Sequence, residues 1–171
     1  MFTLGIIPAR FGSKRLPRKN FLKIGGKTLV EWTMEQAAGA KLLDEYLVST
    51  DDKRPPYLCQ DDTPTLYVLA YHGASVPVVV CLQPNIWGRT SEDIDEAIAY
   101  YRQEGLDTLY SRGFGDRPDG SIWVISGELL RNGRMYGPKT GSLLSKNPII
   151  NIDTEFDFWQ AEQAYERSGH S

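Results

Sequence analysis

Five cations lie within ten residues near the start of the chain, among small and turn-forming residues. The cluster comprises Arg10, Lys14, Arg15, Arg18 and Lys19, interleaved with Gly12, Ser13 and Pro17. Glycine lets a backbone come close to a phosphate group, loop amides donate to its oxygens, and cations offset its charge. The apolar run before it, residues 2–7, is typical of a buried strand ended by Pro8. A solvated basic loop is the commoner outcome for a charge run, but this strand-loop setting favours a phosphate site.

Carboxylates form a second group near the other end of the chain. Asp153 and Asp157 follow an apolar run at 149–152. Thr154 and Asp157 have the spacing of a capping box at a helix start, so we interpret Asp157 as a cap. For Asp153, a turn aspartate before a helix and a carboxylate that takes part in chemistry both remain open.

Overall composition excludes several classes of function. The chain has 171 residues and a net charge of −3, which argues against general nucleic-acid binding and makes the basic cluster a local anion site. Only His72 and His170 are present, so a zinc site or a serine-histidine triad has little support. Cys81 lies in an apolar run and reads as a reduced core thiol. With no signal peptide and no membrane-length apolar run, we expect a cytoplasmic protein without membrane contact.

Strand and helix patterns alternate along the chain. We expect strands at 2–7, 45–49, 76–82, 107–110, 119–125 and 149–152, and helices at 28–40, 64–73, 90–103, 127–131 and from 154 onward. The segments 111–120 and 133–141 read as loops. This order predicts a single α/β domain, residues 1–171, with a mostly parallel sheet covered on both faces. The basic loop and Asp153 should then meet at the carboxyl edge of that sheet.

A glycine-rich turn at 25–28 superficially resembles a phosphate-binding P-loop. The motif needs a glycine where Phe21 stands, so it fails. Thr28 is better interpreted as a helix cap.

The segment I-I-P-A-R-F-G-S-K-R-L-P-R-K-N, residues 6–20, resembles the signature loop of the CMP-acylneuraminate synthetases. These cytidylyltransferases activate sialic acid and related nine-carbon acids. The resemblance implies the nucleotide-diphospho-sugar transferase (Rossmann-like) fold and a loop that holds the triphosphate of CTP. It places that role on Ala9, Arg10, Gly12, Ser13, Lys14 and Lys19, with Asn20 near the nucleotide.

Two further segments resemble the same family. In R-P-P-Y-L-C-Q-D-D-T-P-T, residues 54–65, the resemblance makes Arg54 the group that recognises cytosine, with Thr63 nearby. In L-Q-P-N-I-W-G-R-T, residues 82–90, it places Gln83 at the border of nucleotide and sugar. Related synthetases for the eight-carbon acid KDO carry a metal-binding aspartate where Asn85 stands. An amide is a poorer magnesium ligand than a carboxylate, so Asn85 is not assigned to a metal.

The C-terminal segment I-N-I-D-T-E-F-D-F-W-Q-A-E, residues 150–162, resembles the family's I-D-I-D-T-x-x-D-x-x-x-A-E. That resemblance implies a Mg²⁺ ion held by Asp153. Asn151 replaces the first aspartate of the motif, which removes one carboxylate.

The chain also departs from the family at two places. A helix and strand that relatives carry before the segment at Arg54 are missing, and the arm that relatives insert around 111–120 is nearly absent. In relatives that arm swaps into a partner subunit. The resemblance therefore leaves open whether this chain forms a homodimer.

The predicted reaction is cytidylyl transfer, in which a hydroxyl of a sugar acid attacks the α-phosphorus of CTP and releases pyrophosphate. Catalysis would come from alignment and charge neutralisation, with Arg10, Lys14 and Lys19 taking the phosphate charge and Asp153 the metal. One alternative is a nucleotidyltransferase of the same fold with another NTP or acceptor. A second alternative is a degenerate nucleotide-binding module without turnover.

Overall fold

A computed structural model describes residues 1–13, 15–50 and 65–169. Its centre is a six-stranded sheet with the order β4-β1-β5-β8-β7-β9. The strands are β1 Thr3–Pro8, β4 Glu45–Ser49, β5 Val78–Cys81, β7 Thr108–Arg112, β8 Pro118–Ser126 and β9 Thr140–Leu144. Strands β4, β1 and β5 are parallel neighbours, and β7 and β9 are parallel to each other. Only β8, among the strands of this sheet, runs against both of its neighbours.

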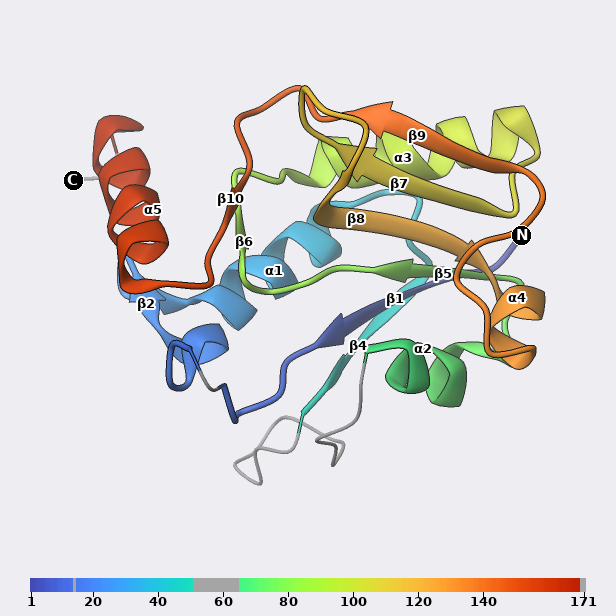
Figure 1. Cartoon of the computed structure of the whole chain (residues 1–171), viewed down its shortest axis with the longest axis horizontal. Helices are drawn as coiled ribbons and strands as arrows, with labels where there is room; N and C mark the ends of the chain where they lie inside the picture. The colour runs from blue at the N-terminus through green and yellow to red at the C-terminus, as the bar shows by residue number, and fades with distance from the viewer. Residues whose placement is uncertain (14, 51–64, 170–171) are drawn as a thin grey trace.

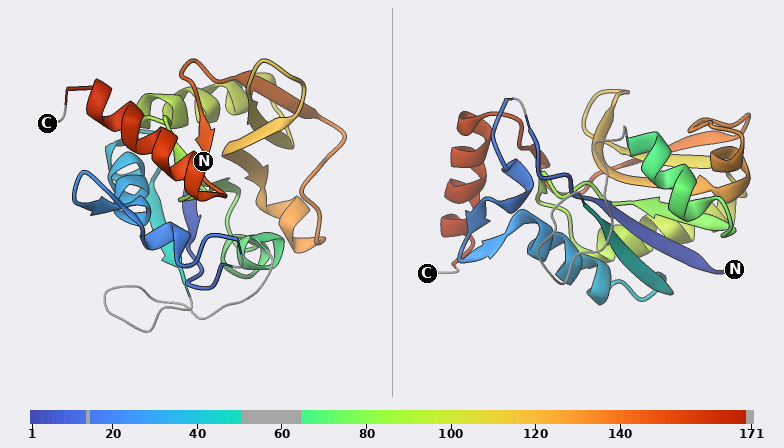
Figure 2. Two further views of the ribbon diagram at one scale, coloured as in Figure 1. Left: turned by 60° about the vertical axis from the view of Figure 1, so that its left-hand side comes forward. Right: turned by 90° about the horizontal axis from the view of Figure 1, so that it is seen from below.

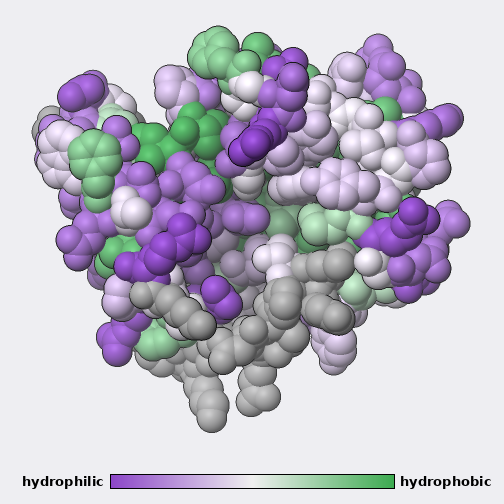
Figure 3. Space-filling view, in the orientation of Figure 1, coloured by the Kyte–Doolittle hydropathy of each residue, from purple (hydrophilic) through white to green (hydrophobic). Residues whose placement is uncertain are grey.

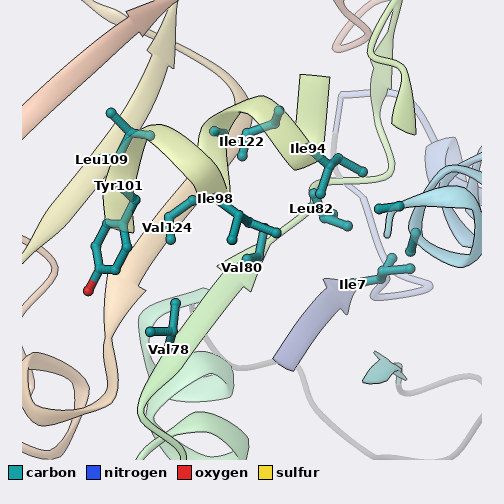
Figure 4. Packing of buried hydrophobic residues seen from close by; sticks show 13 residues of the cluster. Ile7, Val78, Val80, Leu82, Ile94, Ile98, Tyr101, Leu109, Ile122 and Val124 are labelled. Carbon is teal, nitrogen blue, oxygen red and sulfur yellow. The ribbon is translucent and has the colours of Figure 1, made fainter. Parts of the chain in front are cut away.

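Helices cover both faces of this sheet (Figure 1). They are α1 Leu29–Gly39, α2 Thr65–Gly73, α3 Ser91–Glu104 and α4 Gly127–Arg131. One buried cluster joins the sheet to α1 and α3 through residues such as Ala37, Ile94 and Ile98, and Figure 4 shows how its members interdigitate. A second cluster joins the opposite face to α2 and α4 through Leu69 and Leu130. The predicted mostly parallel α/β sheet with two covered faces is confirmed.

A smaller assembly stands at one end of the molecule, where α5 lies beside β10, β6 and β2 (Figures 1 and 2). It consists of β2 Lys23–Ile24, β3 Lys27–Thr28, β6 Ile86–Trp87, β10 Ile150–Asn151 and α5 Glu155–Arg167. A third buried cluster ties it together, with Leu16, Ile24 and Leu29 from the N-terminal part and Ile152 and Ala161 from the C-terminal part. The two ends of the sequence therefore share one core.

Local sequence signals placed the helix starts well. Thr28, Thr90 and Thr154 each form a capping box at the start of α1, α3 and α5. Gly105, in the left-handed conformation, ends α3 just beyond the predicted end of this helix at 103.

Both predicted loops are present but shorter than expected. Half of the segment 111–120 is strand, since β7 continues to Arg112 and β8 begins at Pro118. The predicted loop 133–141 ends where β9 begins at Thr140, and the sequence pattern did not indicate that strand. No helix among the described residues combines the length and the apolar character needed to cross a membrane.

Candidate active site

The N-terminal loop after β1 is held in one shape by contacts of its own. The Ala9 amide donates to the Ser49 carbonyl oxygen at 2.7 Å, which continues the pairing of β1 with β4. The Arg18 guanidinium lies 4.8 Å from the centroid of the Phe11 ring, at a left-handed residue with φ of 54°. Arg18 therefore braces the loop, while Arg10 is exposed to solvent.

Asn20 is buried beneath this loop and is hydrogen-bonded to its backbone. Its Nδ2 donates to the Arg10 carbonyl oxygen at 3.0 Å, and only 4% of the residue is exposed. Among the residues that the structure describes, none donates a hydrogen bond to its Oδ1, which is buried. Leaving a buried acceptor unsatisfied costs about 1–3 kcal/mol. An ionised phosphate only accepts hydrogen bonds, so a donor for this atom would have to be a hydroxyl or amino group of a ligand, or a water molecule.

Lys19 connects the basic loop to the C-terminal acid. Its Nζ lies 2.6 Å from Asp153 Oδ1, although the two residues are 134 positions apart. The Arg15 guanidinium is 3.9 Å from the other carboxylate oxygen, Oδ2. Asp153 retains 33% exposure of its side chain, so this oxygen stays open to a ligand. The predicted convergence of the two ends at one site is thus present in the structure.

Asp157 holds the turn that presents Asp153. Its Oδ2 accepts from the backbone amides of Asp153 and Thr154 at 3.0 and 2.8 Å, and from the Thr154 hydroxyl at 2.8 Å. These hydrogen bonds, the Thr154 hydroxyl first among them, lower the pKa of Asp157. The interpretation of Asp157 as a cap rather than a ligand is confirmed.

Three carboxamide residues, Gln83, Asn85 and Asn151, lie in or next to β5, β6 and β10, and Asn151 precedes Asp153 by two positions. Asn85 Nδ2 donates to Asn151 Oδ1 at 2.6 Å, and the Ile152 amide donates to the Asn85 carbonyl at 2.8 Å. Gln83 follows the end of β5 and is partly buried. The site therefore has a charged half around Lys19 and Asp153 and a neutral half made of carboxamides.

Arg89 is a structural residue of this site that sequence reasoning did not identify. It is 2% exposed, and its guanidinium donates to the carbonyl oxygens of Gln83 at 3.3 Å and Ser121 at 2.6 Å. It also donates to Gln36 Oε1 and Thr33 Oγ1 on α1. Burial lowers the pKa of Arg89 to about 10, which leaves it charged at neutral pH. The sequence shows that Arg89 belongs to the 82–90 segment, but that position alone does not predict that its side chain is buried.

Three of the predicted site residues, Lys14, Arg54 and Thr63, lie outside the described residues. Gly12 is exposed and Ser13 partly buried in the loop. Among the residues that the structure describes, no three histidine, cysteine or acidic side chains come together as a metal cluster. Within this described part of the chain, Asp153 does not belong to such a cluster.

Comparison with known proteins gives a partial match in sequence and a full match in fold. Residues 4–69 match the family model described as Cytidylyltransferase. The 3-deoxy-manno-octulosonate cytidylyltransferase of Leptospira interrogans is 51% identical over 51 residues, 30% of this chain and 21% of that protein. The pseudaminic acid cytidylyltransferase of Campylobacter jejuni is 47% identical over 53 residues, 31% of this chain and 23% of that protein.

The solved structure of a CMP:2-keto-3-deoxy-manno-octonic acid synthetase, complexed with CTP, superposes with a TM-score of 0.77 at 16% identity. The alignment covers 98% of this chain and 100% of the other. At that identity the likeness shows a shared fold, which confirms the predicted nucleotidyltransferase architecture. The sequence matches cover only about a fifth of each curated relative's length.

Proposed function

We propose that the protein is a cytidylyltransferase that transfers CMP from CTP to a sugar acid and releases pyrophosphate. The observation that carries the proposal is the contact of 2.6 Å between Lys19 and Asp153. It joins the phosphate-type loop and the acid at one point, beside the orphaned Asn20 oxygen. The family match of residues 4–69 supports the nucleotide as CTP. A cytoplasmic location is part of the proposal.

In the reaction, a hydroxyl oxygen of the acceptor attacks the α-phosphorus of CTP. One P–O bond forms, the bond to the β-phosphate oxygen breaks, and pyrophosphate leaves as the hydroxyl loses its proton. This step requires no covalent nucleophile from the protein. Lys19 and Arg15 would turn from Asp153 to the phosphate oxygens, and the buried Asn20 Oδ1 would accept a hydrogen bond from the nucleotide.

Asp153 would hold a Mg²⁺ ion through its partly exposed carboxylate, with phosphate oxygens and water as the remaining ligands. Bound there, the ion would neutralise charge on the phosphates during transfer. Asn85 and Asn151 offer only amides, so a site with several carboxylates is not proposed.

The test is pyrophosphate release by the purified chain with CTP, ATP, GTP or UTP. The acceptors are 3-deoxy-manno-octulosonate, pseudaminic acid and N-acetylneuraminic acid. We expect release with CTP and one of these acids. We expect Lys19→Ala to weaken CTP binding about tenfold or more, because a charge-assisted contact to phosphate is lost. Lys139→Ala, which changes an exposed lysine outside the site, is the matched control.

A nucleotide-binding module without turnover is the second candidate. Asn151 favours it, since the motif that the C-terminal segment resembles has a carboxylate there. Calorimetric binding of CTP with no pyrophosphate from any acceptor would support this module and reject the transferase. Release with another nucleotide but not with CTP would support the same fold with a different substrate.

A further inference from the structure

Two carboxamide side chains approach the backbone of β8 at Gly120. Gly120 has φ of +84°, and a Cβ placed on it would lie 3.8 Å from Asn151 Nδ2 and 3.9 Å from Gln83 Oε1. Ile86 Cδ1 would lie 3.6 Å from the same position. We call the surface made by Gln83, Asn85 and Asn151 around Gly120 the amide subsite. It carries no charge of its own, although Asp153 is only two residues from Asn151.

The orientation of the Asn151 amide is fixed by its neighbour. Asn85 Nδ2 donates to Asn151 Oδ1 at 2.6 Å and also faces the Ile152 carbonyl oxygen at 3.4 Å. Because a backbone carbonyl can only accept, the amide nitrogen of Asn85 must be the atom turned toward it. Asn151 must then offer its oxygen to Asn85. Its Nδ2, with two N–H donors, is left to face the subsite.

The backbone at both asparagines is also held. Asn151 pairs with Ile86 between β10 and β6, and the Ile152 amide donates to the Asn85 carbonyl oxygen at 2.8 Å. Arg89 fixes the adjoining strand ends through the carbonyls of Gln83 and Ser121. The donors of Asn151 are therefore preorganised, which lowers the entropic cost of using them on a ligand.

We infer, resting on the proposed function, that Asn151 Nδ2 donates to an oxygen of the acceptor sugar acid, so that the Asn85–Asn151 pair orients the acceptor and holds no metal. A donor at Asn151 Nδ2 and an acceptor at Gln83 Oε1 match hydroxyl and carboxylate oxygens on a short carbon chain. An aspartate at position 151 would repel the carboxylate of such an acceptor. A neutral amide does not repel that carboxylate, although Asp153 is only two residues away. An amide is also a weak ligand for magnesium.

The test measures KM for the acceptor and for CTP separately, with Asn151→Ala and the isosteric Asn151→Asp. We expect both variants to raise acceptor KM about tenfold or more, since a hydrogen bond to a charged oxygen is lost. CTP KM should stay within about twofold of wild type, because Lys19 and Asn20 are unchanged. Asn132→Ala, at an exposed cap of α4, is the matched control and should change neither value.

A second readout counts metal ions without turnover. Electron paramagnetic resonance with Mn²⁺ and α,β-methylene CTP should give the same number of bound ions in wild type and Asn151→Ala. Loss of an ion in Asn151→Ala would overturn the inference, because Asn151 would then be a metal ligand. An unchanged acceptor KM in a folded, active Asn151→Ala protein would overturn it as well. Failure of the wild type to turn over CTP with any acceptor would instead refute the proposed function, and this inference with it.

Discussion

Replacing Arg89 with methionine should destabilise the fold strongly, although the change keeps the length of the side chain. The guanidinium donates to Gln36 Oε1 at 3.0 Å, to Thr33 Oγ1 at 3.1 Å, and to the carbonyl oxygens of Gln83 and Ser121 at 3.3 and 2.6 Å. Arg89 is 2% exposed, and its acceptor residues Thr33 and Ser121 are buried at 1% and 2%, so these two acceptors cannot turn to bulk water when the donors are removed.

The magnitude follows from two opposing effects. Hydrogen bonds to a charged group are worth about 1.5–3 kcal/mol each, so four of them represent roughly 6–12 kcal/mol. The burial of the charge offsets a large part of this, since a buried ion costs several kcal/mol of desolvation. We expect a net loss of about 2–6 kcal/mol, because the two buried acceptors, on Thr33 and Ser121, lose their donor at about 1–3 kcal/mol each. That is a large fraction of the 5–15 kcal/mol typical of a domain's total stability.

Urea denaturation of the purified variant, followed by circular dichroism, measures this loss as a lower midpoint at unchanged slope. Arg134→Met, which removes an exposed arginine, is the matched control and should stay within about 0.5 kcal/mol of wild type. Arg89→Lys should fall between the two, because an ammonium cannot span acceptors on α1 and on two strand ends. A loss below about 1 kcal/mol for Arg89→Met would refute the reasoning that this guanidinium holds the site together.

Three further changes test other parts of the structure. Gly88→Ala should cost more stability than Gly105→Ala in thermal unfolding, because a Cβ at Gly88 (φ +103°) meets a backbone carbonyl oxygen at 2.2 Å whereas Gly105 (φ +60°) has open space. Equal losses of stability in the two variants would mean that the positive φ alone sets the cost, and that the steric contact at Gly88 adds nothing. Burial raises the pKa of Cys81 to about 12, so in a Cys59→Ser background iodoacetamide at pH 8 should modify it only after unfolding; rapid labelling of the native protein would contradict this. Hydrogen bonds lower the pKa of Asp157 below its ordinary 3.8, so the stability it adds is complete at neutral pH and is lost as pH falls below that value. Asp157→Asn should therefore be less stable than wild type at pH 7 and converge with it in acid, and a gap that persists at pH 2 would exclude this origin.

Features encoded within a few neighbouring residues were predictable from the sequence. Thr28, Thr90 and Thr154 each precede an acid by three positions, and each begins a helix. The continuous apolar run at 76–82 gave the central strand β5, which is fully buried. Both signals are local, because a cap satisfies amides of its own first turn and a β-branched run suits a strand covered on both faces.

Features that depend on distant partners were missed. Strand β9, with the sequence T-G-S-L-L, carries little pattern of its own and is defined by its parallel pairing with β7. Arg89 reads as a surface or ligand-binding arginine until α1, the end of β5 and β8 are assembled around it. Local sequence propensity does not predict such features, because the groups that stabilise them come from segments far apart in the chain.

The surface of the molecule combines hydrophilic residues with exposed apolar side chains. In the view of Figure 3, hydrophilic residues cover most of the face, and apolar side chains appear as separate patches. Phe156 and Trp159, 63% and 52% exposed, stack on each other at the outer side of α5. Two aromatic rings of this kind are ordinary for a protein surface and carry no assignment.

The ion pair between Lys19 and Asp153 affects how the proposed nucleotide would bind. Their side chains are 20% and 33% exposed, so the ion pair is screened by water and contributes about 1 kcal/mol or less. Under the proposed function, a triphosphate would bring several negative charges to the same ammonium and would outweigh that loss. Lys19 would then leave Asp153 Oδ1 free for a cation that accompanies the phosphates. The contact thus holds the two side chains 2.6 Å apart without fixing either one tightly.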